Sequence, residues 1–381
     1  MTHSIGTHSE SDVRPYPLVF APVVLEKIWG GRRLERLGKS LPTPQGRYGE
    51  SWEVADLAST SASGAGGGAV RSIIANGPLA GRTLGDAVAR WGSRLIGSAG
   101  GAGDGHGTGP GAAFPLLVKF LDASENLSVQ VHPSPAFLKR HPERGAHLKT
   151  ESWYIVDAEP GAKLYIGLRP GLTRAQFEAH IRDGSLVNDL LSVPAVPGEC
   201  HTLPSGTVHA LGAGVLVAEV QTPSDTTFRV FDWGRTGREL HIADSLASAS
   251  FADTPAEERV APAPGPTSLK PGQLCARLAT TPFYTIDEAR PLDGDELTVG
   301  YRCCGGQTRA GVATSSPESC FVLMVLAGTG ELRVPGGAEP PLSLSAGNTV
   351  VVPASVAPGA AIKGGKGLRV LRVGVGVGDG A

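Results

Sequence analysis

The sequence predicts a mainly β protein of two jelly-roll domains with a small helical segment. Short β-type runs separated by turn residues make up most of the chain, as at 163–168, 215–220 and 228–231. A Pro/Ala-rich run at 261–266 is the best candidate for a linker. Beyond it the succession of strand, Gly turn and strand recurs, with predicted strands at 319–326, 328–334, 349–353 and 368–373. A jelly roll pairs two sheets of such strands and leaves few exposed strand edges.

Two helices are predicted to interrupt the strands of the N-terminal part. We expect a short helix at 83–91. A second helix is predicted at 173–182, because Thr173 is a favourable N-terminal cap and apolar residues recur at helical spacing. Residues 188–191 are expected to continue helically, which gives a helical insert at about 173–192.

The composition excludes several classes of protein. A length of 381 residues suits two domains, and the longest apolar runs are far shorter than the roughly 18 residues of a membrane span. The formal net charge of −2 and the lack of a Lys/Arg block give nucleic acid no binding surface. The polar N-terminus lacks the apolar segment of a signal peptide. The five Cys have no C-x-x-C spacing, and their odd number indicates reduced thiols. We therefore expect a soluble cytoplasmic protein that binds neither nucleic acid nor membranes.

A polar pair inside an apolar β-type run carries the strongest functional signal. Gln130 and His132 lie two residues apart in the run 127–133, so a strand there projects both side chains to one face. A buried amide and a buried imidazole are costly without partners, and a metal ion satisfies both. Glu151 and His209 each stand beside another β-type run. Imidazole and carboxylate ligands suit zinc, and an open coordination position is typical of catalytic sites.

The residues alone leave the ligand set open. Gln130 is a weak, neutral ligand and also fits a hydrogen-bonding role beside the metal. His201 lies eight residues before His209 and competes with it for the ligand role. His141 and His147 stand in a polar stretch and are expected to be solvated.

Four sequence segments contain or adjoin these residues, and their order along the chain matches a known protein family. They are Ser-Val-Gln-Val-His-Pro at 128–133, Lys-Thr-Glu-Ser-Trp-Tyr at 149–154, Pro-Ser-Gly-Thr-Val-His-Ala at 204–210 and Ser-Asp-Thr-Thr-Phe-Arg at 224–229. Supporting pieces lie upstream at 26–31, 49–52 and 115–123. Together they resemble the type I mannose-6-phosphate isomerases (phosphomannose isomerases) of the cupin superfamily, in the short bacterial form. The resemblance runs from about Pro17 to Arg238 and continues weakly to the C-terminus.

The resemblance implies an activity and a cofactor. It implies an aldose–ketose isomerase that interconverts mannose 6-phosphate and fructose 6-phosphate through an enediol, with one zinc ion per chain. It also implies four metal ligands, which are Gln130, His132, Glu151 and His209. The two jelly rolls then correspond to a metal-binding catalytic cupin domain at 15–258 and a C-terminal cupin-like domain at 267–381. The second has no His after His241, so it cannot carry an imidazole-based metal site.

Further pocket residues follow from the same resemblance. The predicted catalytic residues are Arg229, Glu219 and Lys149, and the predicted substrate-binding residues are Lys119, Ser128 and Lys149. Two lysines and an arginine suit a phosphorylated sugar, because cations pair with phosphate oxygens. The proton-abstracting base stays open among a zinc-bound hydroxide, Glu219 and a neutral lysine.

Structural roles compete with these assignments. Arg229 could pair with Asp225 or Asp232, Glu219 could pair with a strand neighbour, and the stem of Lys119 could reach a sheet edge.

Rival functions also stay open. His132, Glu151 and His209 fit the facial triad of an iron oxygenase, although a fourth ligand at Gln130 argues against it. A non-catalytic sugar-phosphate binder and an isomerase of another aldose are further alternatives. The Gly-rich stretches 58–69 and 97–113 could alter access to the pocket, and the sequence leaves monomer and homodimer equally open.

Overall fold

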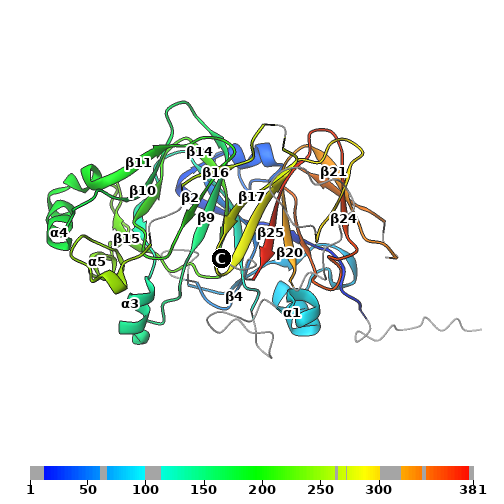
Figure 1. The fold of residues 1–381 in the computed structure, drawn as a ribbon, viewed down its shortest axis with the longest axis horizontal. Helices are drawn as coiled ribbons and strands as arrows, with labels where there is room; N and C mark the ends of the chain where they lie inside the picture. Colours follow the sequence, from blue (N-terminus) through cyan, green and yellow to red (C-terminus); the bar gives the residue numbers. More distant parts are fainter. Residues whose placement is uncertain are drawn as a thin grey trace, which may run out of the picture.

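The computed structural model describes residues 13–60, 67–98, 113–261, 265–271, 273–300, 319–336 and 340–376. In these residues the protein is mainly β, as predicted, with few helices. Most of the strands form four sheets that lie one behind another along the long axis (Figure 1). Most of the Gly-rich stretches at 58–69 and 97–113 lies outside the described residues.

The N-terminal sandwich pairs a seven-stranded sheet with a five-stranded sheet. The first, in the order β16-β12-β9-β14-β7-β2-β3, contains β2 (Val23–Gly31), β3 (Tyr48–Val54), β7 (Leu117–Ala123), β9 (Glu151–Ala158), β12 (Glu199–Leu203), β14 (Val215–Gln221) and β16 (Thr267–Ser268). The second, in the order β11-β10-β13-β8-β15, contains β8 (Val129–Val131), β10 (Lys163–Leu168), β11 (Leu190–Pro194), β13 (His209–Leu211) and β15 (Phe228–Phe231). Ile155 and Val217 of the first sheet pack with Leu164 and Leu211 of the second in one buried cluster.

The C-terminal sandwich repeats this arrangement. Its seven-stranded sheet, in the order β17-β18-β25-β20-β23-β1-β6, contains β1 (Leu18–Ala21), β6 (Ile73–Ile74), β17 (Cys275–Thr280), β18 (Tyr284–Ala289), β20 (Phe321–Ala327), β23 (Thr349–Val352) and β25 (Arg369–Val375). Its four-stranded sheet, in the order β19-β24-β21-β22, contains β19 (Glu296–Thr298), β21 (Thr329–Arg333), β22 (Leu342–Ser345) and β24 (Ala361–Gly364). The pair β4 (Asp56–Leu57) and β5 (Val70–Arg71) stands apart.

The two seven-stranded sheets pack back to back and share a hydrophobic core. Leu216 and Ala218 of β14 belong to the same buried cluster as Ile286 of β18 and Met324 of β20. Burying apolar surface between sheets is the main favourable term in such a fold. The C-terminal sandwich therefore packs against one face of the N-terminal seven-stranded sheet. The other face of that sheet packs against the five-stranded sheet.

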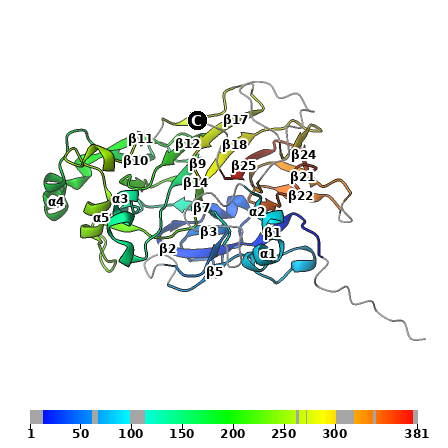
Figure 2. The same ribbon diagram turned by 60° about the horizontal axis from the view of Figure 1, so that its bottom comes forward.

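The N-terminal strand belongs to the C-terminal sandwich. β1 pairs with β23, with Leu18 opposite Val351, and α1 (Leu84–Trp91) packs in the shared core (Figure 2). The predicted boundaries 15–258 and 267–381 follow sequence order and remain a prediction. The pairing of β1 with β23 shows that the strands before residue 75 are divided between both sandwiches.

Two of the helices in the described residues begin with capping boxes. Thr83 and Thr173 form capping boxes at α1 and at α4 (Arg174–Asp183), in agreement with both helix predictions. With α3 (Pro135–Arg140) and α5 (Ile242–Ser248), α4 covers the outer face of the five-stranded sheet. The fifth helix is the short α2 (Ser93–Ile96). Within the described residues no helix is long and apolar enough to cross a membrane.

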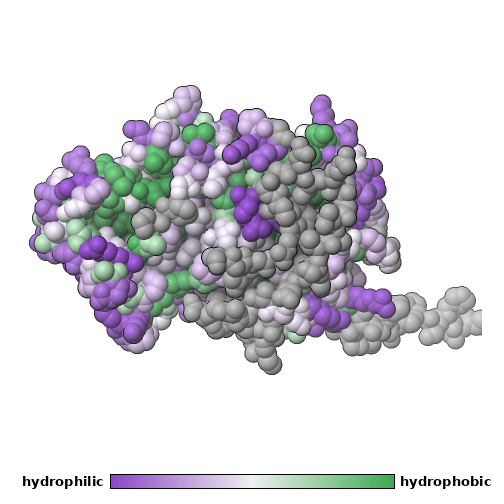
Figure 3. Space-filling model, viewed as in Figure 1, coloured by the Kyte–Doolittle hydropathy of each residue, from purple (hydrophilic) through white to green (hydrophobic). Residues whose placement is uncertain are grey.

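The prediction of helical structure at 188–191 is wrong for its second half. A 3₁₀ helix ends at Asp189, and Leu190 begins β11, which pairs antiparallel with β10. The sheet edge offers Leu190 and Leu191 backbone partners that an isolated turn lacks. Leu191 and Val193 are exposed on this edge strand, where Figure 3 shows apolar side chains at the surface.

Candidate metal centre

Two rows of side chains on facing sheets build the site. Residues directly opposite one another on adjacent strands project to the same face. The strand register across β3, β7, β14 and β9 sets side by side Trp52, Lys119, Glu219 and Trp153. The register across β13, β8 and β15 sets side by side His209, Gln130 and Arg229. Each row is thus a direct result of strand pairing between segments far apart in the sequence.

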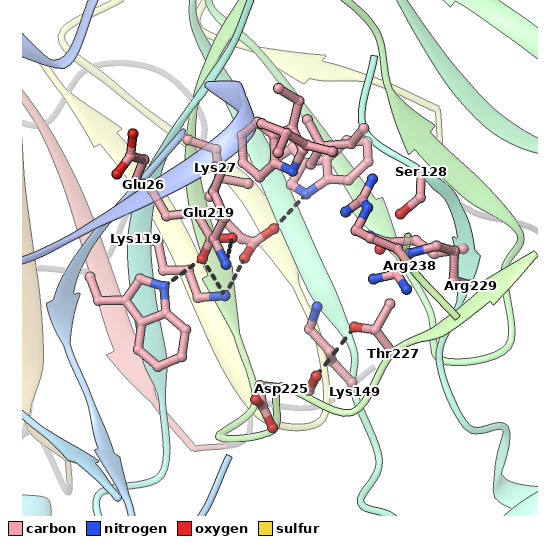
Figure 4. A pocket seen from close by; sticks show the side chains of 18 residues that line it. Glu26, Lys27, Lys119, Ser128, Lys149, Glu219, Asp225, Thr227, Arg229 and Arg238 are labelled. Carbon is pink, nitrogen blue, oxygen red and sulfur yellow. Dashed lines mark hydrogen bonds and ion pairs between the residues drawn. The ribbon is translucent and has the colours of Figure 1, made fainter. Parts of the chain in front are cut away.

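A cavity of about 300 Å³ is lined by residues of both rows (Figure 4). Six of the predicted site residues line it, namely Lys119, Ser128, Gln130, Lys149, Glu219 and Arg229. The other three, His132, Glu151 and His209, are buried beside its wall, and their ligand atoms all lie within 4.8 Å of one another. The structure thus brings all nine predicted site residues into one neighbourhood.

The two imidazoles are oriented for metal binding. His132 Nδ1 lies 3.1 Å from the carbonyl oxygen of Thr226, and His209 Nδ1 lies 2.8 Å from that of Thr207. A carbonyl oxygen only accepts hydrogen bonds, so each Nδ1 carries a proton and Nε2 is the nitrogen that faces the cluster for metal binding. Backbone contacts of this kind hold histidine ligands in metal sites.

Several acceptor atoms converge at Glu151, and one of its carboxylate oxygens lacks a hydrogen-bond donor. Its Oε2 lies 2.7 Å from Lys149 Nζ and 3.2 Å from His132 Nε2. Its Oε1 is buried without a hydrogen bond, although His209 Nε2 lies 3.2 Å away. The amide nitrogen of Gln130 lies 3.2 Å from the same His209 atom, and rotating the amide would present an oxygen instead. Such converging acceptors fit a divalent cation, which would satisfy the orphaned oxygen.

Burial and neighbouring charges keep His132 and Glu151 in the protonation states that a metal requires. Burial, with the Lys149 ammonium, lowers the pKa of His132 to about 3, so the imidazole is neutral near pH 7. Burial alone would raise the pKa of Glu151, but the Lys149 ammonium holds it well below 4.5. Metal ligands must be deprotonated, so these shifts favour binding.

An alternating chain of charges lines the other side of the cavity. Glu50 Oε1 lies 3.1 Å from Lys27 Nζ and Glu50 Oε2 lies 3.8 Å from Lys119 Nζ, which in turn lies 3.4 Å from Glu219 Oε1. Trp153 Nε1 donates to Glu219 Oε2 at 2.9 Å. Burial, with the charge of Glu151, raises the pKa of Glu219, whereas Lys27 and Lys119 outweigh burial at Glu50 and lower its pKa to about 2.

Replacing Glu50 by Gln should flatten the acid dependence of stability. The carboxyl has a pKa of about 2 when folded against an ordinary value of 4.5, so its stabilisation is complete above pH 4.5 and is lost as the pH falls towards 2. The stability difference between wild type and Glu50→Gln should shrink over this window by at most about 1.4 kcal/mol per pH unit. Urea unfolding of the chelated proteins measures it. Glu178→Gln, which removes a surface carboxylate, is the control. A stability difference between wild type and Glu50→Gln that does not change with pH would contradict the lowered pKa of Glu50.

In the described part of the chain, Arg229 is held by a backbone carbonyl rather than by the carboxylate of Asp232. Its Nη1 donates to the carbonyl oxygen of Glu239 at 2.7 Å, and its buried Nε has no hydrogen-bond partner. Asp232 is instead bound by Arg235 and Arg238. The guanidinium of Arg229 thus keeps donor capacity towards the cavity, where it lies across from Lys119 (Figure 4).

Sequence reasoning missed several residues of the cavity wall, among them Lys27, Glu50 and Arg238. Lys27 and Glu50 stand in the upstream segments that carried the resemblance, yet no role was assigned to them. A pair of opposite charges in two apolar strands was the signal that could have found them. The competing ligand His201 is not part of the cluster: it lines a different cavity, and its Nε2 lies 3.3 Å from Glu199 Oε2.

Comparisons with known proteins identify the family of the chain. No protein-family model matches the chain. The "probable mannose-6-phosphate isomerase GmuF" of Bacillus subtilis is 38% identical over 237 residues, which cover 61% of this chain and 67% of the relative. The chain belongs to the mannose-6-phosphate isomerase family. The solved mannose 6-phosphate isomerase of Bacillus subtilis superposes with a TM-score of 0.70 and 28% identity, covering 94% of this chain and 99% of that chain.

A more distant member of the mannose-6-phosphate isomerase family shares the fold. A solved mannose 6-phosphate isomerase described as bound with zinc and yttrium has a TM-score of 0.65 and 19% identity, covering 95% of this chain and 100% of that chain. At this identity the likeness concerns the architecture alone. Membership in the family makes the chain an isomerase, as predicted.

Proposed function

We propose that the chain is a zinc-dependent isomerase that interconverts mannose 6-phosphate and fructose 6-phosphate through an enediol. The observation that carries this proposal is the buried cluster of His132, Glu151 and His209 beside a cavity lined by cations. Two imidazoles and a carboxylate suit zinc. One such cluster supports one zinc ion per chain, with Gln130 as the fourth ligand. A bound zinc ion would stabilise negative charge that develops on the sugar oxygens.

The chain's own residues would position the sugar phosphate. Five cationic side chains line the cavity together with four carboxylates, and the cations are Lys27, Lys119, Lys149, Arg229 and Arg238. Lys27 and Lys119 already contact Glu50 or Glu219, whereas Arg229 has an unpartnered Nε. We therefore assign Arg229 to the substrate, where a guanidinium can donate to an anionic oxygen.

Proton transfer is the second task of the pocket. The pKa of Glu219 is raised by burial and by Glu151, which fits a carboxyl that accepts and returns a proton. Its Oε1 faces Lys119 and its Oε2 accepts from Trp153, so the carboxyl group is held in a fixed orientation. Lys149 is bonded to Glu151 and lines the cavity, which suits a donor to a sugar oxygen. We propose Ser128 as a further substrate contact from the same wall.

The amide of Gln130 faces the cluster from the cavity wall. In this position it would occupy a coordination site that an oxygenase keeps for oxygen or a cosubstrate, which favours the isomerase over the iron oxygenase. We also propose a cytoplasmic location, since the substrates are phosphorylated metabolites.

Incubation of the purified, zinc-loaded protein with mannose 6-phosphate tests the function. We expect fructose 6-phosphate to appear, followed by nuclear magnetic resonance, and the reverse reaction to reach the same equilibrium mixture. Free mannose and glucose 6-phosphate serve as competing substrates that separate phosphate recognition from sugar recognition. Absence of conversion by protein with full zinc content would contradict the proposal and favour a binding role or another aldose.

A further inference from the structure

Strand β9 alternates between the candidate metal centre and the C-terminal sheet. Glu151 belongs to the metal cluster and Trp153 lines the cavity, so Ser152 and Tyr154 project to the opposite face. Both of these residues are buried. The neighbouring strands turn mainly apolar side chains such as Phe120 to the same interface, so polar contacts stand out there.

Residues of the C-terminal sheet bond both back-face side chains of β9. The hydroxyl of Tyr284, on β18, lies 3.1 Å from Ser152 Oγ, which also lies 3.0 Å from Thr202 Oγ1. Arg369, on β25, donates from Nη2 to Tyr154 Oη at 2.6 Å. The C-terminal sheet thus holds β9 at the residue that follows Glu151 and again two residues further along.

We propose that Tyr284 is a positioning residue for the metal centre, acting through Ser152 on the strand that presents Glu151. The proposal rests on the proposed function only in that the cluster of His132, Glu151 and His209 binds a divalent metal. It gives the C-terminal sandwich a part in the site although its described residues contribute none of the candidate ligands.

The geometry explains why a contact on the back of the sheet reaches the ligand. Ser152 and Glu151 are consecutive in a strand paired on both sides, so displacement of one moves the other. The side chain of Tyr284 is fully buried, so water does not replace a lost bond and the Ser152 hydroxyl loses a partner. Ligand atoms need to be held within about 0.5 Å of the productive geometry.

Cobalt(II) titrated into the chelator-treated full chain tests the proposal. Tyr284→Phe keeps the ring and removes only the hydroxyl. We expect its cobalt(II) dissociation constant to rise about 3- to 10-fold, less than the 10- to 100-fold cost of losing a contact made directly to a ligand, and the visible absorption bands to shift. Thr285→Val, which alters the opposite face of β18, should leave both unchanged.

Ser152→Ala is the second variant and should reproduce the effect, with no further change when it is combined with Tyr284→Phe. If Tyr284→Phe binds cobalt(II) with the wild-type affinity and spectrum, the proposal is overturned. If the tyrosine variant does not fold, the same result in Ser152→Ala overturns it. Absence of cobalt(II) binding by the wild-type chain overturns it together with the metal site. Cobalt(II) binding by the wild-type chain, together with no isomerisation by the zinc-loaded chain, contradicts the proposed function alone.

Discussion

Substitution of His132 or His209 by alanine should remove both the bound metal and the isomerase activity. Each imidazole presents Nε2 to Glu151 at 3.2 Å and is held by a backbone carbonyl at Nδ1. When either histidine is replaced, the cluster of His132, Glu151 and His209 retains only one imidazole ligand. We expect the turnover number to fall by more than about 100-fold, beyond the usual cost of losing a residue that only supports a ligand. Metal analysis after dialysis, together with the isomerase assay, measures both effects.

His201→Ala is the matched control for these variants. His201 is also buried and also near a carboxylate, but it lines a different cavity and is not one of the three clustered ligands. Its replacement should leave metal content and turnover near the wild-type values. Full zinc content in either His132→Ala or His209→Ala would show that the ligand assignment is incorrect.

Substitution of Arg229 by alanine should preserve the metal and lower the rate. The guanidinium has no contact with the three clustered ligands; it donates to the carbonyl oxygen of Glu239, and its buried Nε has no hydrogen-bond partner. Removal of one well-placed donor typically lowers kcat by about 100-fold or more. Steady-state kinetics on the zinc-loaded variant, with its metal content measured in the same sample, checks this expectation.

Arg235→Ala controls for the loss of an arginine near this pocket. Arg235 bonds Asp232 and the carbonyl oxygen of Asn126 and does not line the cavity. It should turn over substrate at close to the wild-type rate. A near-normal turnover number for Arg229→Ala would remove Arg229 from the mechanism, and loss of its zinc would assign it a structural role.

Strand periodicity made much of the site predictable. The two-residue period of a strand predicts that Gln130 and His132 project to one face. The segments that resemble the isomerase family identify Glu151 and His209 as further candidates. The pairing partners were beyond the sequence, because register depends on contacts between distant segments. Only the structure shows that Gln130 stands opposite both His209 and Arg229, and that Lys119 stands opposite both Glu219 and Trp52.

The limits of sequence reasoning follow from the same physics. Lys27 and Glu50 were overlooked because each is an ordinary charged residue until two strands bring them within 3.1 Å. The pairing of β1 with β23 joins segments more than 300 residues apart, which no local pattern encodes. Leu190 and Leu191 were expected to be helical because short apolar runs suit both helix and strand, and the edge of β10 decided the outcome.

The most direct test of a metal-dependent isomerase is to follow metal content and activity together during removal and return of zinc. The wild-type chain is dialysed against chelator, and conversion of mannose 6-phosphate is measured as zinc is added back. We predict that activity is lost with the metal and returns in proportion to bound zinc, reaching its maximum at about one ion per chain. Full activity in metal-free protein would contradict the account.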